Sequence, residues 1–134
     1  MNVHIEFLAP LQFYDTMNNN SVVVKLTYGD TSFLMMGDAE KEEEQDLLNS
    51  GANLQADVIK IGHHGSKTST TQEFLNAVQP DMAVISVGPD KNELPKSEVL
   101  QRLEASNVKT YRTDSSGTVI FMSDGADITV ATEQ

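Results

Sequence analysis

The sequence predicts an α/β fold in which a mixed β-sheet has flanking helices. Strands rich in β-branched residues alternate with amphipathic helices through the middle of the chain. Hairpin turns are predicted at Gly29-Asp30 and Asp124-Gly125, near the two ends, and they make the sheet mixed rather than purely parallel. A length of 134 residues suits one domain of ordinary size, so residues 1–134 are expected to form a single domain.

The first half of the chain is predicted to contain three strands and one helix. In order, the elements are strand 3–10, loop 11–20, strands 21–28 and 31–36, and a helix over 40–51. Pro10 stops the first strand, and the helix has an acidic first turn and a closing Gly51. The acidic run "EKEEE", residues 40–44, is expected to be a solvated helix face.

The second half repeats this alternation of strand, loop and helix. The elements are strand 56–62, loop 63–70, helix 71–79, strand 82–88, loop 89–95, helix 96–107 and strands 108–113, 117–123 and 126–132. Thr70 or Thr71 is the expected cap of the helix that ends before Pro80. The prediction therefore contains seven or eight strands and three helices.

Charge and composition exclude several classes of function. A formal net charge of −11 argues against a nonspecific nucleic-acid binder, and any DNA contact would need a local cation. The absence of cysteine excludes disulfides, thiolate metal sites and cysteine nucleophiles, so a metal would be held by His and carboxylate.

The chain has neither an apolar run of the roughly 20 residues that a membrane helix needs nor the features of a signal peptide. We expect a soluble segment without a membrane span. Because it opens directly on a strand, we expect it to be part of a longer protein. The location of that parent stays open, and an extracytoplasmic or membrane-attached parent is compatible with the sequence.

Three features could carry chemistry, and each also has a structural explanation. Asp38 follows a strand through Gly37, where ligands collect in α/β folds, although a lone Asp there is more often a helix cap. His63 and His64, two of the three histidines, also follow a strand, where they could be hydrogen-bonded structural residues. The loop "NNNS", residues 18–21, is explained by turn chemistry or by a role at a site.

Together these features indicate a hydrolytic metal site. Asp38 and the two histidines end strands that the intervening helix could place side by side, and imidazole with carboxylate suits Zn²⁺ or Mn²⁺. The set is incomplete because a catalytic zinc normally has three protein ligands. The remaining histidine, His4, lies far away inside a predicted strand.

The residues also resemble a known family. The strings "NNNSVVVKL", "FLMMGDAE", "DVIKIGHHGSKTST", "PDMAVISVG" and "VKTYRTDSSGTVIF" occur in that order. They resemble the second half of the metallo-β-lactamase-like domain of the ComEC competence protein family and its free-standing relatives. The resemblance runs from about Val3 to Asp127.

The resemblance implies a four-layer αββα fold made of two similar halves, of which residues 1–134 would be the C-terminal half. The metal site of that fold lies in the cleft between the halves and holds Zn or Mn, with two ions possible in the complete domain. The implied metal ligands are Asp38 and either His63 or His64, and the His-Gly pair favours His64. Asn20, Ser21, Ser66 and Lys67 would line the cleft and bind substrate.

Two departures from the family pattern affect this site. The string His-x-His-x-Asp-His of the first half is absent, so half of the site is expected to be missing. Relatives also carry Tyr-Gly-His-Pro where this chain reads "NELP", with Leu94 in place of the histidine. The loop around Asn92 is therefore expected to lack a contact to substrate or metal.

The implied function is part of a metal-dependent phosphodiesterase or nuclease linked to DNA uptake, inactive as an isolated half. Its partners would be the missing N-terminal half and nucleic acid or another phosphodiester. The alternative is a non-catalytic binding or assembly module with an incomplete metal site, and a third possibility is an α/β domain whose histidines are only structural. A lone half would expose one apolar sheet face and self-associate, and the residues expected on that face are Val22, Val24, Leu26, Ile59, Ile61, Val84 and Ile85.

Overall fold

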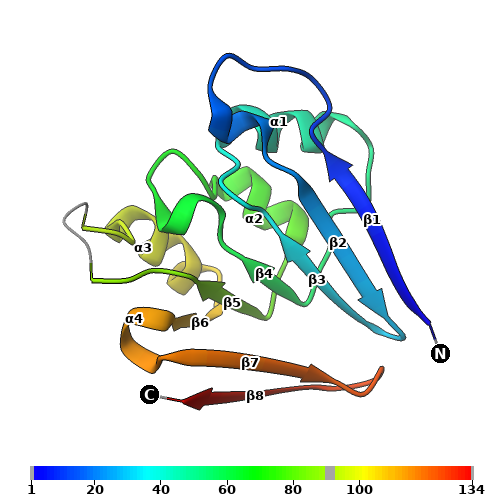
Figure 1. The fold of residues 1–134 in the computed structure, drawn as a ribbon, viewed down its shortest axis with the longest axis vertical. Helices are drawn as coiled ribbons and strands as arrows, with labels where there is room; N and C mark the ends of the chain where they lie inside the picture. Colours follow the sequence, from blue (N-terminus) through cyan, green and yellow to red (C-terminus); the bar gives the residue numbers. More distant parts are fainter. Residues whose placement is uncertain (1, 90–92, 134) are drawn as a thin grey trace.

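A computed structural model describes residues 2–89 and 93–133. It contains one six-stranded sheet, a separate two-stranded sheet and helices α1, α2 and α3, which lie along one side of the large sheet (Figure 1). The strands are β1 (Val3–Ala9), β2 (Val23–Tyr28), β3 (Thr31–Met35), β4 (Val58–Lys60), β5 (Met82–Ile85), β6 (Lys109–Arg112), β7 (Thr118–Ser123) and β8 (Ile128–Glu133). The helices are α1 (Lys41–Asn49), α2 (Gln72–Val78), α3 (Ser97–Ala105) and α4 (Thr113–Ser116), with 3₁₀ turns η1 (Met17–Asn20) and η2 (Gly62–Gly65).

The large sheet is mixed, as predicted. Its strands follow the order β1-β2-β3-β4-β5-β6, in which β1, β2 and β3 are antiparallel neighbours and β3 to β6 run parallel. Helices α1, α2 and α3 each connect one parallel strand to the next. Parallel strands need such a long crossover connection, which is usually a helix. The predicted α/β class is confirmed.

The main core lies between the large sheet and the three helices. Leu34, Ile59 and Ala83 come from three successive strands and are fully or almost fully buried. Phe74 of α2 and Leu103 of α3 are buried in the same apolar cluster. Alternate side chains of a strand point to opposite faces, so this set defines the face of the sheet on the helix side.

The prediction of an exposed apolar sheet face was wrong for three of the residues assigned to it. Ile59, Ile61 and Ile85 belong to the buried core, whereas Val24 and Val84 are only partly buried. Parallel strands that are covered on both faces read as continuous apolar runs, so their two faces could not be separated by sequence alone.

The opposite face of the sheet is partly covered by the β7–β8 hairpin. Phe121 of β7 makes edge-to-face contacts with Phe33 of β3 and Tyr111 of β6, at centroid distances of 6.4 and 5.9 Å. The hairpin is also anchored at the β2–β3 turn, where Asp30 N donates to Gly125 O at 2.7 Å. The expected C-terminal strands are therefore confirmed, and they form a second, small sheet rather than an extension of the first.

The acidic run at the start of α1 is only partly a solvated face: Glu42 is exposed as expected, whereas Glu43 and Glu44 are buried. Glu43 and Glu44 are both 1% exposed. Glu44 accepts hydrogen bonds from Thr70 N, Thr71 N and Thr71 Oγ1, so it ties α1 to the loop before α2. Neither carboxylate oxygen of Glu43 accepts a hydrogen bond within the described residues. Burial raises the pKa of Glu43 to about 7.

The sequence also predicted a lost contact in the loop around Asn92 and no membrane-spanning helix. Asn92 lies outside the described residues, and Leu94 packs partly buried against the main core. No helix within residues 2–89 and 93–133 has the length and apolar character needed to cross a membrane.

Candidate functional site

The candidate site lies at one edge of the large sheet, where several elements meet. Strands β3, β4 and β5 are parallel neighbours, so the residues that follow them emerge at the same edge. Strand β2 runs antiparallel to β3, so the residues that precede it lie at this edge too. The four contributions are the Gly37-Asp38 turn, turn η2 with the two histidines, Ser86, and the loop that ends at Ser21.

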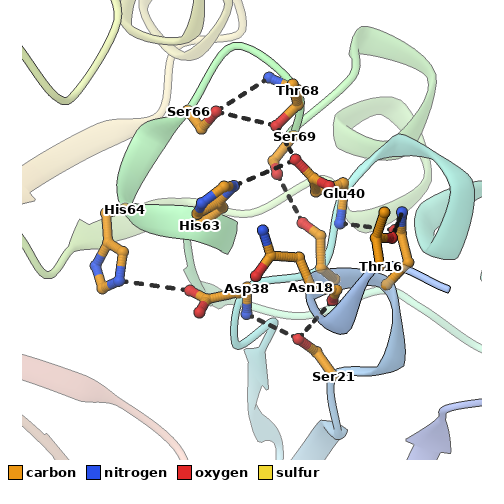
Figure 2. A network of polar contacts seen from close by, with 12 residues as sticks. Thr16, Asn18, Ser21, Asp38, Glu40, His63, His64, Ser66, Thr68 and Ser69 are labelled. Carbon is orange, nitrogen blue, oxygen red and sulfur yellow. Dashed lines mark hydrogen bonds and ion pairs between the residues drawn. The ribbon is translucent and has the colours of Figure 1, made fainter. Parts of the chain in front are cut away.

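Asp38 and His64 face each other across this edge (Figure 2). His64 Nε2 is 3.4 Å from Asp38 Oδ1. On its other side, His64 Nδ1 is 2.6 Å from the backbone oxygen of Ser86. A carbonyl oxygen only accepts hydrogen bonds, so Nδ1 donates to Ser86 O, and Nε2 is the ring nitrogen directed toward the Asp38 carboxylate.

Asp38 does not cap the helix that follows it. Residue Glu40 stands at the N-cap position of α1, and the hydrogen bonds at this end come instead from Asn19, whose Oδ1 accepts from Glu40 N and Glu43 N at 3.2 Å each. The Asp38 carboxylate is thus left for the histidine. The structural explanation of Asp38 as a cap is wrong.

His63 has a different partner from His64. Its Nδ1 lies 3.3 Å from Glu40 Oε2, and the same carboxylate oxygen accepts a hydrogen bond from Thr68 Oγ1 (Figure 2). Both histidines have left-handed backbone conformations, with φ of 50° and 55°. This conformation is uncommon for residues with a Cβ and turns the two adjacent side chains to separate carboxylates.

Gly65 holds the histidine turn against the loop before α3. Its φ is +83°, and a Cβ at this position would lie 2.4 Å from Pro95 Cβ. Gly65 O also accepts a hydrogen bond from Lys96 N at 2.9 Å. A glycine is therefore required here both by the backbone conformation and by the close approach of Pro95.

The "NNNS" segment, residues 18–21, hydrogen-bonds to the backbone of Asp38. Ser21 Oγ accepts a hydrogen bond from Asp38 N at 3.1 Å and donates to Asn18 O at 2.7 Å. Asn20 binds the backbone of its own loop, with Oδ1 accepting from Tyr14 N at 2.8 Å and Nδ2 donating to Tyr14 O at 2.6 Å. This segment positions the Asp38 turn.

The other residues expected to bind substrate lie on the histidine loop. Ser66 Oγ is 2.9 Å from Thr68 Oγ1, next to the His63–Glu40 pair. Lys67 is exposed, and its side chain makes no hydrogen bond or ion pair with any described residue. A shallow cavity of about 310 Å³ adjoins His64 and is lined by Ser86, Val87, Gly88 and Thr113.

The site holds too few ligands for a complete metal centre. Within residues 2–89 and 93–133, no three His, Asp or Glu side chains are grouped so that they could hold one ion. Asp38 and His64 form a pair, and Glu40 and His63 form another. The donor types suit Zn²⁺ or Mn²⁺, and further ligands would have to come from outside the described chain.

Glu40 and Ser86 contribute to the site and were missed by sequence reasoning, and Asn19 of the "NNNS" segment acts at the start of α1, a role that was not predicted. Glu40 could have been suggested by its place two residues after Asp38 at the same strand end. Asn19 acts on a helix that begins more than twenty residues later, and Ser86 acts only through its backbone oxygen. Neither of these two roles has a signal in the sequence.

Comparison with known proteins decides the family. The model of the metallo-beta-lactamase superfamily matches residues 3–88, which is more than half of the chain. The chain belongs to this superfamily. Asp38, Glu40, His63, His64 and Ser86 lie inside the matched region.

Three relatives confirm the resemblance to competence proteins. ComE operon protein 3 of Bacillus subtilis is 44% identical over 105 residues, which cover 78% of this chain and 14% of that protein. Competence protein ComA of Neisseria gonorrhoeae is 38% identical over 122 residues, covering 89% and 18%. Recombination protein 2 of Haemophilus influenzae is 35% identical over 119 residues, covering 87% and 15%. This chain thus spans less than a fifth of the length of these relatives.

Proposed function

We propose that this chain is the C-terminal half of a metal-dependent hydrolase that cleaves phosphodiesters, nucleic acid among them, in a protein linked to DNA uptake. The observation that carries the proposal is the pair formed by Asp38 and His64. Family membership and the competence names of the relatives support it. As an isolated half, the chain is expected to be inactive.

The residues of the pair fit a divalent metal. The Ser86 carbonyl accepts the proton of His64 Nδ1, which is the usual way in which a metal-binding histidine is held in one tautomer. With Nδ1 engaged by Ser86, Nε2 is the ring nitrogen that can coordinate a metal, and it lies 3.4 Å from Asp38 Oδ1, close enough for one cation to contact both. A divalent ion held here would supply Lewis acidity and lower the pKa of bound water.

The remaining residues at this edge of the sheet hold the two proposed metal ligands in place or lie where they could contact the substrate. Ser21 fixes the backbone of Asp38, and Ser86 fixes the ring of His64. Glu40, itself held by Thr68, orients His63, which stands beside the pair and would contact the substrate or a second ion. Lys67 is a cation near the site that could approach a phosphate in this acidic chain.

The second candidate function is a non-catalytic binding or assembly module. It is favoured by one observation: the described residues offer two metal ligands at Asp38 and His64, and no third. In this case the metal site would have been lost, and the fold would serve as a binding surface. The two functions differ in whether a preceding half-domain completes the site.

Metal titration tests the proposed ligands. The wild-type chain should bind Zn²⁺ or Mn²⁺ weakly by calorimetry, because two ligands hold an ion less tightly than three or four. The Asp38→Ala and His64→Ala variants should lose this binding, while His4→Ala, the matched control in β1, should keep it. Equal binding isotherms for all four proteins would show that Asp38 and His64 do not bind the metal.

A nuclease assay separates the two functions. The lone chain should not hydrolyse bis-p-nitrophenyl phosphate faster than Mn²⁺ alone. Addition of the segment that precedes the matched region in the Bacillus subtilis relative should restore turnover that depends on Asp38 and His64. Folded complexes without turnover would favour the binding module, and turnover by the lone chain would show that its site is complete.

A further inference from the structure

We infer that the loop between β1 and β2 binds an unpaired base of the nucleic acid whose backbone meets the Asp38–His64 pair. The base would stack on Phe13, beside Pro10 and Leu11, and these three residues are called the stacking platform below. The inference rests on the proposed function, because it takes nucleic acid as the substrate. It adds the part of the substrate that is recognised and the requirement that this part be single-stranded.

The first observation is that the loop presents large apolar side chains to water. Phe13 is 83% exposed, Leu11 is 52% exposed and Met17, at the start of η1, is 88% exposed. One exposed apolar residue needs no explanation. Three of them within residues 11–17, in a loop otherwise made of polar residues, indicate a binding surface.

The second observation is that the loop is held in place on both sides of Phe13. Gln12 Nε2 donates to Asp46 Oδ1 at 2.6 Å, and the Tyr14 hydroxyl donates to Asp46 Oδ2 at 2.7 Å, so both neighbours are tied to α1. Asn20 also bonds to the backbone N and O of Tyr14. The Phe13 side chain is therefore presented by a preformed loop, and a ligand would lose little affinity to ordering it.

The third observation is a shallow cavity of about 350 Å³ beside the platform. Its lining combines Pro10, Leu11 and Phe13 with the amides of Gln12 and Asn20. Gln12 uses only its Nε2 in hydrogen bonds with described residues, so its Oε1 is available as an acceptor. A nucleobase has the matching combination, because it carries a flat face that stacks and N–H groups at its edge.

The platform lies at the same edge of the sheet as the Asp38–His64 pair. Strands β1 and β3 are both antiparallel to β2, so the loop after β1 begins where the Asp38 turn follows β3 (Figure 1). At its other end, Asn20 lines the cavity and the next residue, Ser21, binds Asp38 N. A nucleic-acid strand with one phosphate at the pair could therefore place a neighbouring base on Phe13.

Charge favours a base over a phosphate as the group that this loop binds. The chain has a net charge of −11, and the loop over residues 11–20 contains Asp15 but no Lys or Arg. Such a loop repels phosphates, whereas a base is neutral and stacks on an aromatic ring whatever its sequence. The bases of a duplex are already stacked and paired, so the platform selects a single strand.

The test is a titration of the metal-free 134-residue chain, followed by nuclear magnetic resonance of residues 11–20. The probes are a mixed-sequence DNA octamer, its duplex, and an abasic octamer of the same length and charge. We expect the single strand to shift the signals of Phe13 and Met17, and the duplex and the abasic strand to bind about tenfold more weakly or less.

Substitutions separate stacking from general stickiness of the loop. Phe13→Ala should weaken binding of the single strand about tenfold, and Phe13→Trp should retain it because the larger ring still stacks. Phe7→Ala in β1 is the matched control, since Phe7 is 75% exposed but lies outside the loop, and it should change nothing. Added salt should not weaken binding, in contrast to binding led by phosphate contacts.

Several outcomes would overturn the inference. They are equal binding of the abasic strand, binding that survives Phe13→Ala, affinity that falls with salt, and absence of binding. Loss of binding when the segment that precedes the matched region in the Bacillus subtilis relative is added would also overturn it, because the loop would then be a protein interface.

The inference and the proposed function can fail separately. Single-strand binding that depends on Phe13, without Asp38-dependent hydrolysis when the preceding segment is present, would support the platform and contradict the proposed function. Asp38-dependent hydrolysis of bis-p-nitrophenyl phosphate, without Phe13-dependent binding of the octamer, would support the proposed function and overturn the platform.

Discussion

Gly65 is the residue on which the geometry of the two histidines depends most. It follows His64 directly, and its contacts with Pro95 and Lys96 fix the end of the turn. Its position shows how a small backbone requirement supports a chemical site. The left-handed conformations of His63 and His64 thus lie directly beside a turn end that is anchored to the loop before α3.

Replacement of Gly65 by Ala should lower the free energy of unfolding by about 2 kcal/mol or more. The new Cβ would meet Pro95 Cβ at 2.4 Å in a backbone conformation with positive φ. Gly51→Ala is the matched control, because Gly51 has φ +79° but no neighbouring atom within 4 Å. Urea unfolding should show a clearly larger loss for Gly65→Ala, and equal losses would mean that the contact with Pro95 is unimportant.

Glu43 should make stability depend on pH. Its carboxyl group titrates near the ordinary value of 4.5 when unfolded and at about 7 when folded. Between these values the folded state keeps a proton that the unfolded state has lost, so stability is fully present below pH 4.5 and falls as pH rises through 7. The Glu43→Gln variant should be more stable than wild type at pH 8, by about 2 kcal/mol after allowance for solvent screening.

The measurement for Glu43 is urea unfolding of both proteins at pH 5 and pH 8. The difference between variant and wild type should appear mainly at pH 8. A difference that is the same at both pH values would show that the Glu43 carboxyl does not titrate differently in the folded protein.

At the scale of elements, the alternation of strands and helices was predictable because each segment carries its own periodicity. The convergence of Asp38 and the histidines also followed from this, since neighbouring parallel strands end at one edge. Burial of Glu44 was not predictable, because its hydrogen-bond partners are Thr70 and Thr71, distant in sequence. The sequence pattern of an acidic helix face is the same whether its carboxylates are solvated or accept hydrogen bonds from buried backbone N–H groups.

The loop before β2 and helix α1 form one structural unit through Asn19. Its side chain accepts hydrogen bonds from two backbone N–H groups at the start of α1 and donates to Glu42 Oε2 at 3.0 Å. Asn19→Ala should therefore lower the free energy of unfolding by about 1 kcal/mol, which is the typical effect of removing an N-cap side chain. Asn49→Ala, at the exposed end of the same helix, is the control, and thermal unfolding should separate the two; equal effects would contradict the capping role.

At the scale of the whole molecule, the exposed apolar residues of β1 lie beside a hairpin that is also apolar on its outer side. The isolated chain should therefore self-associate weakly at high concentration, held back by its net charge. Sedimentation velocity should show reversible association that grows with salt. Phe7→Lys should abolish it, and a wild-type chain that stays monomeric at high concentration and high salt would contradict this expectation.

The most direct test of the central claim, that Asp38 and His64 bind one metal ion together, is nuclear magnetic resonance of the imidazole nitrogens during a Zn²⁺ titration. The chain has three histidines, so each ring can be assigned. We predict that His64 Nε2 shifts on addition of Zn²⁺ while Nδ1 keeps its proton, that His4 does not change, and that Asp38→Ala removes the effect. A His64 ring that does not respond to Zn²⁺, or responds equally without Asp38, would contradict the claim.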